Sequence, residues 1–239
     1  MVEVEHVNNP EVLDPNSVEV RFGDPKVDAR QLLELYTDPT TREHIEGIVP
    51  LAYEEEYTLK DPDTGKQEFK KRTISATTVE NIREDYRRNS NLTLLTAKDP
   101  SSGLIIVTCT VTKLSDNVAE IGKVVVHKDY RGKRIVDTVI KSANALMFRE
   151  GFGGLDCKVA QAFVIFGSSG EDRIPGYHTA LNAFGRQGYK VVGQRPEGST
   201  KSWSNELGKL VDRSSFQLEL SRKDYIQVFT GAHRRDFPK

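Results

Sequence analysis

Apolar and polar residues recur with regular periods over most of the chain, and these periods predict both strands and helices. Three β-rich runs with short polar turns between them predict an antiparallel meander; the runs cover residues 92–98, 104–114 and 118–127. Apolar residues then recur at helical spacing from Ile135 to Met147, Gly151 follows as a helix end, and a further strand spans 155–166. A strand, a long helix and a strand in succession imply a right-handed parallel crossover. The pattern therefore predicts an α/β fold with a mixed, mostly antiparallel sheet.

Weaker patterns on either side predict the remaining elements and the domain limits. We expect strands at 18–22, 189–193 and 214–222, and helices at 27–36, 77–89 and 177–187. Residues 50–75 combine turn-forming and charged residues, which predicts an inserted, protruding loop or hairpin, and 194–209, with Trp203, is interpreted as a loop. We assign 18–222 to one domain, 1–17 to a flexible N-terminal arm and 223–239 to a C-terminal tail.

Length and composition exclude several classes of protein. The 239 residues carry 34 Lys and Arg against 35 Asp and Glu, a net charge of −1, so no global basic footprint favours nucleic-acid binding. The longest nearly apolar run, 104–111, is too short to span a bilayer, and the acidic start does not resemble a signal peptide. Cys109 and Cys157 lie in apolar runs without metal-ligand spacing. We expect a cytoplasmic protein, monomer or homodimer, with no metal, nucleic-acid partner or membrane partner.

The junction between the strand that ends at His127 and the following helix is the candidate for chemistry. A glycine and three basic residues stand there, namely Arg131, Gly132, Lys133 and Arg134. Free backbone N–H groups and the positive end of the helix dipole make such a turn a cradle for a phosphate or pyrophosphate. A solvated basic helix start is the structural alternative. Neither the nucleotide P-loop string nor the dinucleotide-binding G-x-G-x-x-G is present.

The segment "KVVVHKDYRGKRIV" resembles the coenzyme-A-binding motif of the GNAT acetyltransferase superfamily, and "ALNAFGRQGYKVVG" is similar to its second signature. The resemblance covers residues 18–222 in the family's element order. It implies a GNAT-like acyl-CoA N-acyltransferase fold that binds acetyl-CoA as co-substrate. By resemblance, the backbone of Val124, Val125 and Val126 would bind the pantetheine arm. The pyrophosphate would be held by Arg131, Gly132, Lys133, Arg134, Ile135, Val136 and Asp137.

The chain departs from the family pattern at three positions that bear on function. Arg134 and Val136 replace glycines, and a β-branched side chain at Val136 limits close approach of the backbone to phosphate. Arg134 could compensate with charge-assisted hydrogen bonds to the same phosphate. Phe184 stands where many relatives place a tyrosine that acts as general acid. Coenzyme binding is therefore better supported by the sequence than catalysis.

Amine acetylation requires an unprotonated amine, a polarised thioester and a proton for the departing thiolate. Glu120 matches a frequent position of the base in the family, and strand alternation places it on the same face as Val126, six residues later. A solvent-facing carboxylate is the structural alternative. Tyr177 and His178 are the candidate acids, each with a capping or packing role as alternative, and the Val126 N–H is the candidate donor to the thioester carbonyl.

These residues predict direct transfer of an acetyl group from acetyl-CoA to an amine on a small molecule or a protein. Two alternatives stay open. The first is a GNAT-fold coenzyme-A-binding or regulatory protein that has lost catalysis, which Val136 and Phe184 favour. The second is an acyltransferase whose donor is acyl carrier protein, for which Lys133 and Arg134 would be docking residues.

Overall fold

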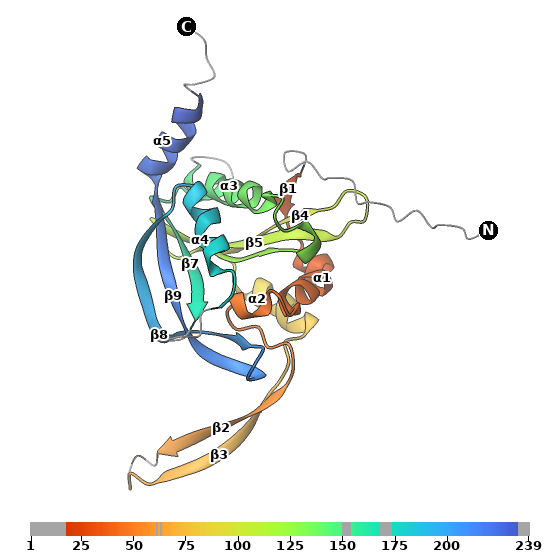
Figure 1. Cartoon of the computed structure of the whole chain (residues 1–239), viewed down its shortest axis with the longest axis vertical. Helices are drawn as coiled ribbons and strands as arrows, with labels where there is room; N and C mark the ends of the chain where they lie inside the picture. The colour runs from red at the N-terminus through yellow and green to blue at the C-terminus, as the bar shows by residue number, and fades with distance from the viewer. Residues whose placement is uncertain (1–17, 61, 63, 150–153, 168–173, 234–239) are drawn as a thin grey trace, which may run out of the picture.

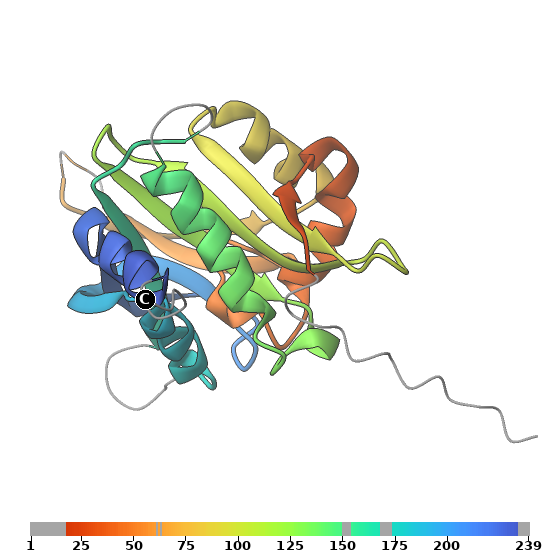
Figure 2. The same ribbon diagram turned by 90° about the horizontal axis from the view of Figure 1, so that it is seen from above.

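The main body of the molecule is a twisted sheet with helices on both faces (Figures 1 and 2). The computed structural model describes residues 18–60, 62, 64–149, 154–167 and 174–233. Within them seven strands form one sheet in the order β1-β4-β5-β6-β7-β9-β8. The strands are β1 (Val20–Phe22), β4 (Leu92–Lys98), β5 (Ile105–Lys113), β6 (Val118–Val126), β7 (Val159–Gly167), β8 (Lys190–Ser204) and β9 (Lys209–Ser221). Neighbouring strands are antiparallel except β6 and β7, which are parallel, so the predicted mixed sheet is confirmed.

Two pairs of helices cover the two faces of this sheet (Figure 2). α1 (Pro25–Thr37) and α2 (Val79–Arg88) lie on one face, and α3 (Ile135–Phe148) and α4 (Tyr177–Arg186) on the other. Each pair buries a cluster of apolar side chains against the strands. Short 3-10 helices η2 (Arg42–His44) and η3 (Lys128–Tyr130) connect elements on the edge where β6 ends.

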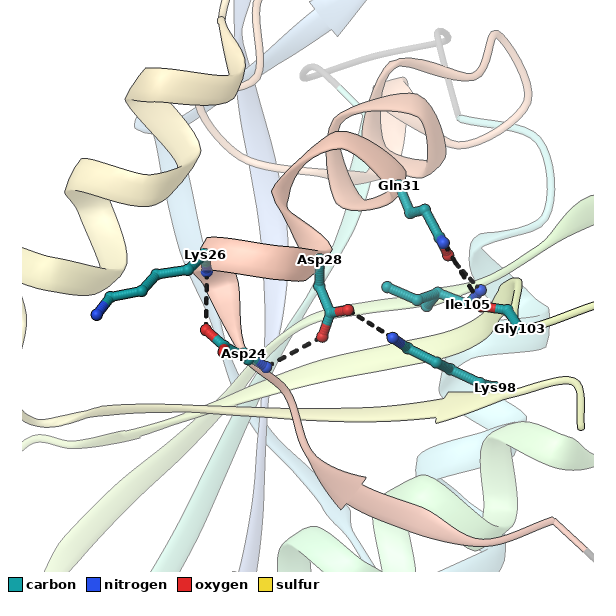
Figure 3. Close-up of polar contacts among 7 residues, drawn as sticks. All are labelled: Asp24, Lys26, Asp28, Gln31, Lys98, Gly103 and Ile105. Carbon is teal, nitrogen blue, oxygen red and sulfur yellow. Dashed lines mark hydrogen bonds and ion pairs between the residues drawn. The ribbon is translucent and has the colours of Figure 1, made fainter.

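Polar contacts fix α1 to the sheet (Figure 3). The Asp24 side chain caps the helix by accepting from the Lys26 N–H at 2.9 Å. Asp28 is only 3% exposed, and its carboxylate accepts from Lys98 Nζ at 2.6 Å. One turn later the Gln31 side chain accepts from the backbone N–H of Ile105 at 2.7 Å. A buried carboxylate requires such a partner, so these contacts fix how α1 sits on the sheet.

β6 and β7 separate part of the way along their length, and this separation positions the candidate site. Their parallel register runs only from Val118↔Val159 to Ile121↔Ala162. β6 continues to Val126 and β7 to Gly167, so the far half of each strand has no partner across the opening. We call this opening the wedge. The backbone of β6 on its β7 side therefore faces the wedge beyond Ile121 instead of a neighbouring strand.

A β-bulge interrupts β6 at the start of the wedge. Thr108 pairs with Val125 whereas Thr110 pairs with Gly122, so β6 contains one residue more than β5. Lys123 adopts a left-handed conformation with φ of 45°. The extra residue exchanges the two faces of the strand on either side of the bulge.

Two segments outside the core of the sheet form strands: one is a hairpin and the other is a long extension of β8. Residues predicted as a protruding loop or hairpin form the antiparallel pair β2 (Tyr53–Lys60) and β3 (Gln67–Ile74), which extends away from the main sheet (Figure 1). Most of the predicted loop 194–209 is instead a continuation of β8 to Ser204, which pairs with β9 from Thr200↔Arg213 to Ser204↔Lys209, and only residues 205–208 form a turn. The turn-forming sequence of this stretch produces a register shift between Arg195 and Thr200 and does not end the strand.

The C-terminal segment also differs from the prediction. The described part of the expected tail belongs to α5 (Arg222–His233), and the Tyr225 ring stacks on Phe148 with centroids 4.9 Å apart. Among the described residues, no helix is both long and apolar enough to cross a membrane. The predicted arm 1–17, the helix end at Gly151 and residues 234–239 lie outside the described residues.

A buried hydrogen bond from Tyr189 to Asn144 joins the start of β8 to α3, and its loss should destabilise the fold. The hydroxyl donates to Asn144 Oδ1 at 2.7 Å, and both residues are at most 5% exposed. We expect Tyr189→Phe to lower the free energy of unfolding by about 1–3 kcal/mol, because the amide oxygen loses its buried donor. Tyr53→Phe is the control, since the Tyr53 hydroxyl has no hydrogen-bond partner among the described residues. Equal urea midpoints for the two variants would contradict this account.

Candidate active site

A cavity of about 350 Å³ lies in the wedge between β6 and β7 and extends to the starts of α3 and α4. We call it the wedge cavity. Several of its lining residues are those that the sequence assigns to coenzyme binding: Val124, Val125, Val126, Arg131, Gly132, Arg134, Ile135 and Val136. The structure therefore brings the end of a strand, a basic turn and a helix start to one cavity.

Two of the predicted coenzyme-binding residues do not line this cavity. The Lys133 ammonium lies 5.1 Å from the centroid of the Tyr130 ring. The Asp137 carboxylate forms an ion pair with Arg186 of α4, with Nη2 and Oδ1 2.7 Å apart. Asp137 therefore connects α3 to α4, and its negative charge is neutralised next to the helix start.

The turn before α3 uses left-handed backbone at two positions. Gly132 has a φ of 79° and Arg134, the N-cap of α3, has a φ of 57°. The family pattern has a glycine at the second of these positions, and the structure keeps the conformation that glycine favours although an arginine stands there. The Arg134 side chain does not cap the helix, so the first N–H groups of α3 lie beside the wedge cavity without a side-chain cap. Free N–H groups at the positive end of a helix bind anions.

Neighbouring side chains hold this turn in place. Arg131 Nε donates to the carbonyl oxygen of Val126 at 3.2 Å, which connects the turn to the end of β6. The Tyr130 hydroxyl donates to the Asp99 carboxylate, and this bond raises the pKa of Tyr130 to about 12. Both hydrogen bonds restrict the position of the basic turn relative to the strand.

A second cavity of about 460 Å³ adjoins the wedge cavity on the α2 side of β6. We call it the carboxylate cavity, because Glu46, Asp85 and Glu120 line it. The two cavities share the wall formed by His44, Ile121, Gly122, Lys123, Phe163 and Ile165. A group bound along β6 in the wedge cavity would therefore meet a group bound in the carboxylate cavity at the bulge.

Glu120 lies in the carboxylate cavity, and burial raises the pKa of its carboxyl, with the nearby Glu46 acting in the same direction and Arg195 opposing it. Its Oε1 atom is 3.9 Å from the point where a Cβ on Gly122 would lie, so the carboxylate leans toward the bulge. Among the described residues, none donates a hydrogen bond to this carboxylate. A half-buried carboxylate with a raised pKa and no partner is suited to accept a proton.

The predicted alignment of Glu120 with Val126 on one face of β6 is wrong. Glu120 pairs with Thr112 and Val126 with Val107, and residues five apart on the regular strand β5 face opposite sides. The extra residue at the bulge is the cause. The two cavities nevertheless share a wall at the bulge. Glu120 therefore lies next to the wedge cavity, although it is on the other face of the sheet.

The two expected acids lie away from both cavities. The Tyr177 ring is 6% exposed and packs beside Phe216 in the core cluster under α4, and His178 is exposed with its ring 3.8 Å from that of Tyr177. Neither residue lines the wedge cavity or the carboxylate cavity. Phe184, in contrast, lines the wedge cavity.

His44 and Lys123 line both cavities, and the sequence analysis did not find them. Burial lowers the pKa of His44, and the charges of Arg131 and Arg213 lower it further. Burial also lowers the pKa of Lys123, whose Nζ lies 5.8 Å from the centroid of the Tyr36 ring. Gly122 inside a strand pattern is the signal that could have indicated the bulge and with it Lys123. His44 has no local signal, because η2 reaches the site only through the tertiary fold.

Comparison with solved structures shows which fold this architecture represents. The ribosomal-protein-S5-alanine acetyltransferase from Vibrio fischeri matches 87% of this chain and 94% of its own, with a TM-score of 0.56 and 11% identity. A GNAT-family acetyltransferase from Bacillus anthracis covers 86% of this chain and 95% of its own, with a TM-score of 0.53 and 12% identity. An N-acetyltransferase from Staphylococcus aureus Mu50 covers 86% and 98%, with a TM-score of 0.52 and 9% identity.

The chain therefore has the fold of GNAT acetyltransferases, as the resemblance in its sequence predicts. No protein-family model matches the chain, and no curated protein matches it in sequence.

The left-handed backbone at Arg134 predicts that a glycine there stabilises the fold. A side chain with a Cβ is strained in this conformation, so Arg134→Gly should raise the free energy of unfolding by about 0.5–1 kcal/mol. Arg134→Ala is the matched control, because it removes the guanidinium and keeps the Cβ. Urea denaturation of the three proteins measures the difference. If the glycine and alanine variants were equally stable, the backbone at this position would carry no strain.

Proposed function

We propose that the chain is an acetyl-CoA-dependent N-acetyltransferase that moves the acetyl group directly to an amine. The observation that carries the proposal is the meeting of two chemically different cavities at the β6 bulge. The wedge cavity has a basic helix start and an unpaired strand edge, whereas the carboxylate cavity has a half-buried carboxyl with a raised pKa. The GNAT fold of the chain supports the same reaction class.

The wedge cavity fits a long thioester donor with a phosphorylated end. The backbone of Val124 to Val126 faces the wedge, where a pantetheine arm with its amide groups would complete the hydrogen bonding of the strand. Arg131 and Arg134 line the cavity beside the first N–H groups of α3, where a pyrophosphate would lie. The donor's acetyl end would then point along β6 toward the bulge.

Glu120 is the proposed base, acting directly or through a water molecule. It takes a proton from the acceptor ammonium, and the freed nitrogen lone pair attacks the thioester carbonyl carbon. A carbon–nitrogen bond forms while the carbon–sulfur bond breaks, and the electron pair leaves on sulfur. The second proton of the former ammonium passes to the Lys123 amine once Lys123 has protonated the thiolate. A wedge-facing N–H of β6 next to the bulge stabilises the oxyanion, because Val126, the expected donor, lies at the pyrophosphate end of the strand. No covalent enzyme intermediate is required.

Lys123 is the proposed proton source for the departing thiolate. It lines both cavities, and its lowered pKa makes proton release easier than from an exposed lysine. The Tyr130 hydroxyl also lines the wedge cavity but donates to Asp99. Phe184 has no proton to give, and this favours a second candidate function, a coenzyme-A-binding protein without transferase activity.

Exchange of one carboxylate tests the proposed function. Glu120→Gln keeps the side-chain shape and removes its basicity, so kcat for acetyl transfer to an amine panel should fall about 10²–10⁴-fold. The Kd for acetyl-CoA, measured by calorimetry, should not change. Glu54→Gln in the exposed hairpin β2–β3 is the control and should behave like the native protein. Tight acetyl-CoA binding without transfer to any amine would favour the second candidate function, and absence of binding would contradict both.

The raised pKa of Glu120 adds a pH dependence with a definite sign. The folded state favours the protonated carboxyl, so its contribution to stability is present at low pH and is lost as pH rises through the folded pKa. Glu120→Gln cannot ionise, so it should become more stable than the native protein as pH rises above about 4.5, the ordinary glutamate value. The acidic limb of native kcat/KM should lie above the same value. If the difference in stability between the native protein and Glu120→Gln did not vary with pH, folding would not raise the pKa of Glu120.

A further inference from the structure

The far half of the β8–β9 hairpin buries a row of polar side chains that the proposed reaction does not use. Arg213 is 6% exposed, Thr200 is 3% exposed, and Ser202 and Ser215 are fully buried. Thr200 and Arg213 are directly opposite in the register, so their side chains lie on one face of the hairpin. Ser202 and Ser215 are each two residues further along their strands and share that face.

This row lacks hydrogen-bond partners. Among the described residues, nothing pairs with Arg213 Nε or with the hydroxyls of Thr200, Ser202 and Ser215. A buried cation and several buried hydroxyls without partners carry a large desolvation cost, so their retention together requires an explanation.

The nearby carboxylates are engaged elsewhere or lie beyond ion-pair distance of Arg213 in the described part of the chain. Asp212 faces the other side of the hairpin, where its Oδ1 lies 3.6 Å from Lys201 Nζ. Glu55 accepts from Arg72 Nε at 2.8 Å, and Glu43 accepts from the Asn205 N–H at 2.7 Å. Glu43, Glu55 and Glu206 line the same surface hollow as Arg213, and none of the three forms an ion pair with it. The guanidinium charge is therefore available to an anion.

The row adjoins the carboxylate cavity. Thr200 lines that cavity, in company with Glu46, Asp85 and Glu120. Arg213 itself lines a third hollow, and this hollow shares Pro175 with the wedge cavity. Arg195, opposite Ser215 on β8, covers the Phe163 ring at 3.4 Å from its centroid, and Phe163 belongs to the wall that the wedge cavity and the carboxylate cavity share.

We infer that Arg213, with the hydroxyls of Thr200, Ser202 and Ser215, binds a carboxylate carried by the acceptor, so that the acceptor is an amino acid or a related amino carboxylic acid. This inference rests on the proposed function. The acceptor would have its ammonium among Glu46, Asp85 and Glu120 and its carboxylate at the buried arginine. A planar guanidinium binds a carboxylate through two parallel hydrogen bonds, and the hydroxyls are donors to the remaining lone pairs. Arg213 supplies one positive charge and the three hydroxyls are neutral, so the site balances the single negative charge of a carboxylate.

Matched acceptors that differ only in this charge test the inference. The twenty common amino acids and their carboxamides are each offered with acetyl-CoA, and kcat/KM is compared within each pair. For the native protein, the preferred amino acid should exceed its carboxamide by about ten- to a hundredfold, the value of a charge-assisted hydrogen bond. In Arg213→Gln the ratio should fall to about one. Lys190→Gln, at the exposed start of β8 and outside the hollow that Arg213 lines, should keep the native ratio.

A second measurement does not depend on turnover. Melting temperatures are recorded with saturating acetyl-CoA and millimolar amino acid or carboxamide, for the native protein, Arg213→Gln and Thr200→Val. The native protein should be stabilised by the amino acid more than by its carboxamide, and both variants should lose this difference. Without any ligand, Arg213→Gln should melt higher than the native protein, because an uncompensated buried charge is removed.

The outcomes separate this inference from the proposed function. Equal transfer to the amino acid and the carboxamide, or no differential stabilisation by either, would overturn the carboxylate site while leaving acetyl transfer intact. Absence of stabilisation by acetyl-CoA itself would instead contradict the proposed function. A lower melting temperature of ligand-free Arg213→Gln would show that the guanidinium stabilises the fold, and this would also overturn the inference.

Discussion

The candidate site depends on one backbone constraint, the separation of β6 from β7 after four paired residues. Beyond Ile121 and Ala162 the polar groups on one edge of β6 face a cavity, and buried backbone groups require partners. A ligand with amide groups spaced along an extended chain satisfies this requirement in the way that a strand does. The wedge also positions the other parts of the site, because α3 begins where β6 ends and α4 begins where β7 ends.

The bulge in β6 lies between two cavities that are lined by different charged groups. Basic groups of the α3 turn line the cavity on one side, and three carboxylates, together with Arg88 and Lys123, line the cavity on the other. Lys123 and Gly122 form the common wall between them. Under the proposed function, an anionic donor and a cationic amine enter from different sides and meet at the strand. Opposite charges in adjacent cavities favour this arrangement over the reverse one.

The sequence predicts the parts of this architecture that depend on local patterns. The meander, the crossover helix and the basic turn at Arg131 to Arg134 follow from periodicity and from one glycine among basic residues, and the structure contains them. The bulge could not be predicted from a local pattern. Strand alternation places Glu120 and Val126 on one face, and only the register between β6 and β5 reveals the extra residue. His44 reaches the site through η2 and Thr200 reaches it through the extended β8–β9 hairpin, and both placements depend on tertiary packing. Tyr177 is a candidate acid by residue type, because its hydroxyl can donate a proton. In the structure its ring is packed in the core cluster under α4.

Hydrogen exchange of backbone amides, with and without coenzyme A, tests the central role of the wedge most directly. If the coenzyme completes the free edge of β6, amides between Lys123 and Val126 and those in the first turn of α3 should exchange at least about tenfold more slowly in the complex. Amides of β2 and β3, which lie away from the wedge, should not change. Coenzyme that binds while leaving the β6 edge and the α3 start unprotected would contradict the account, because the ligand would then occupy another surface.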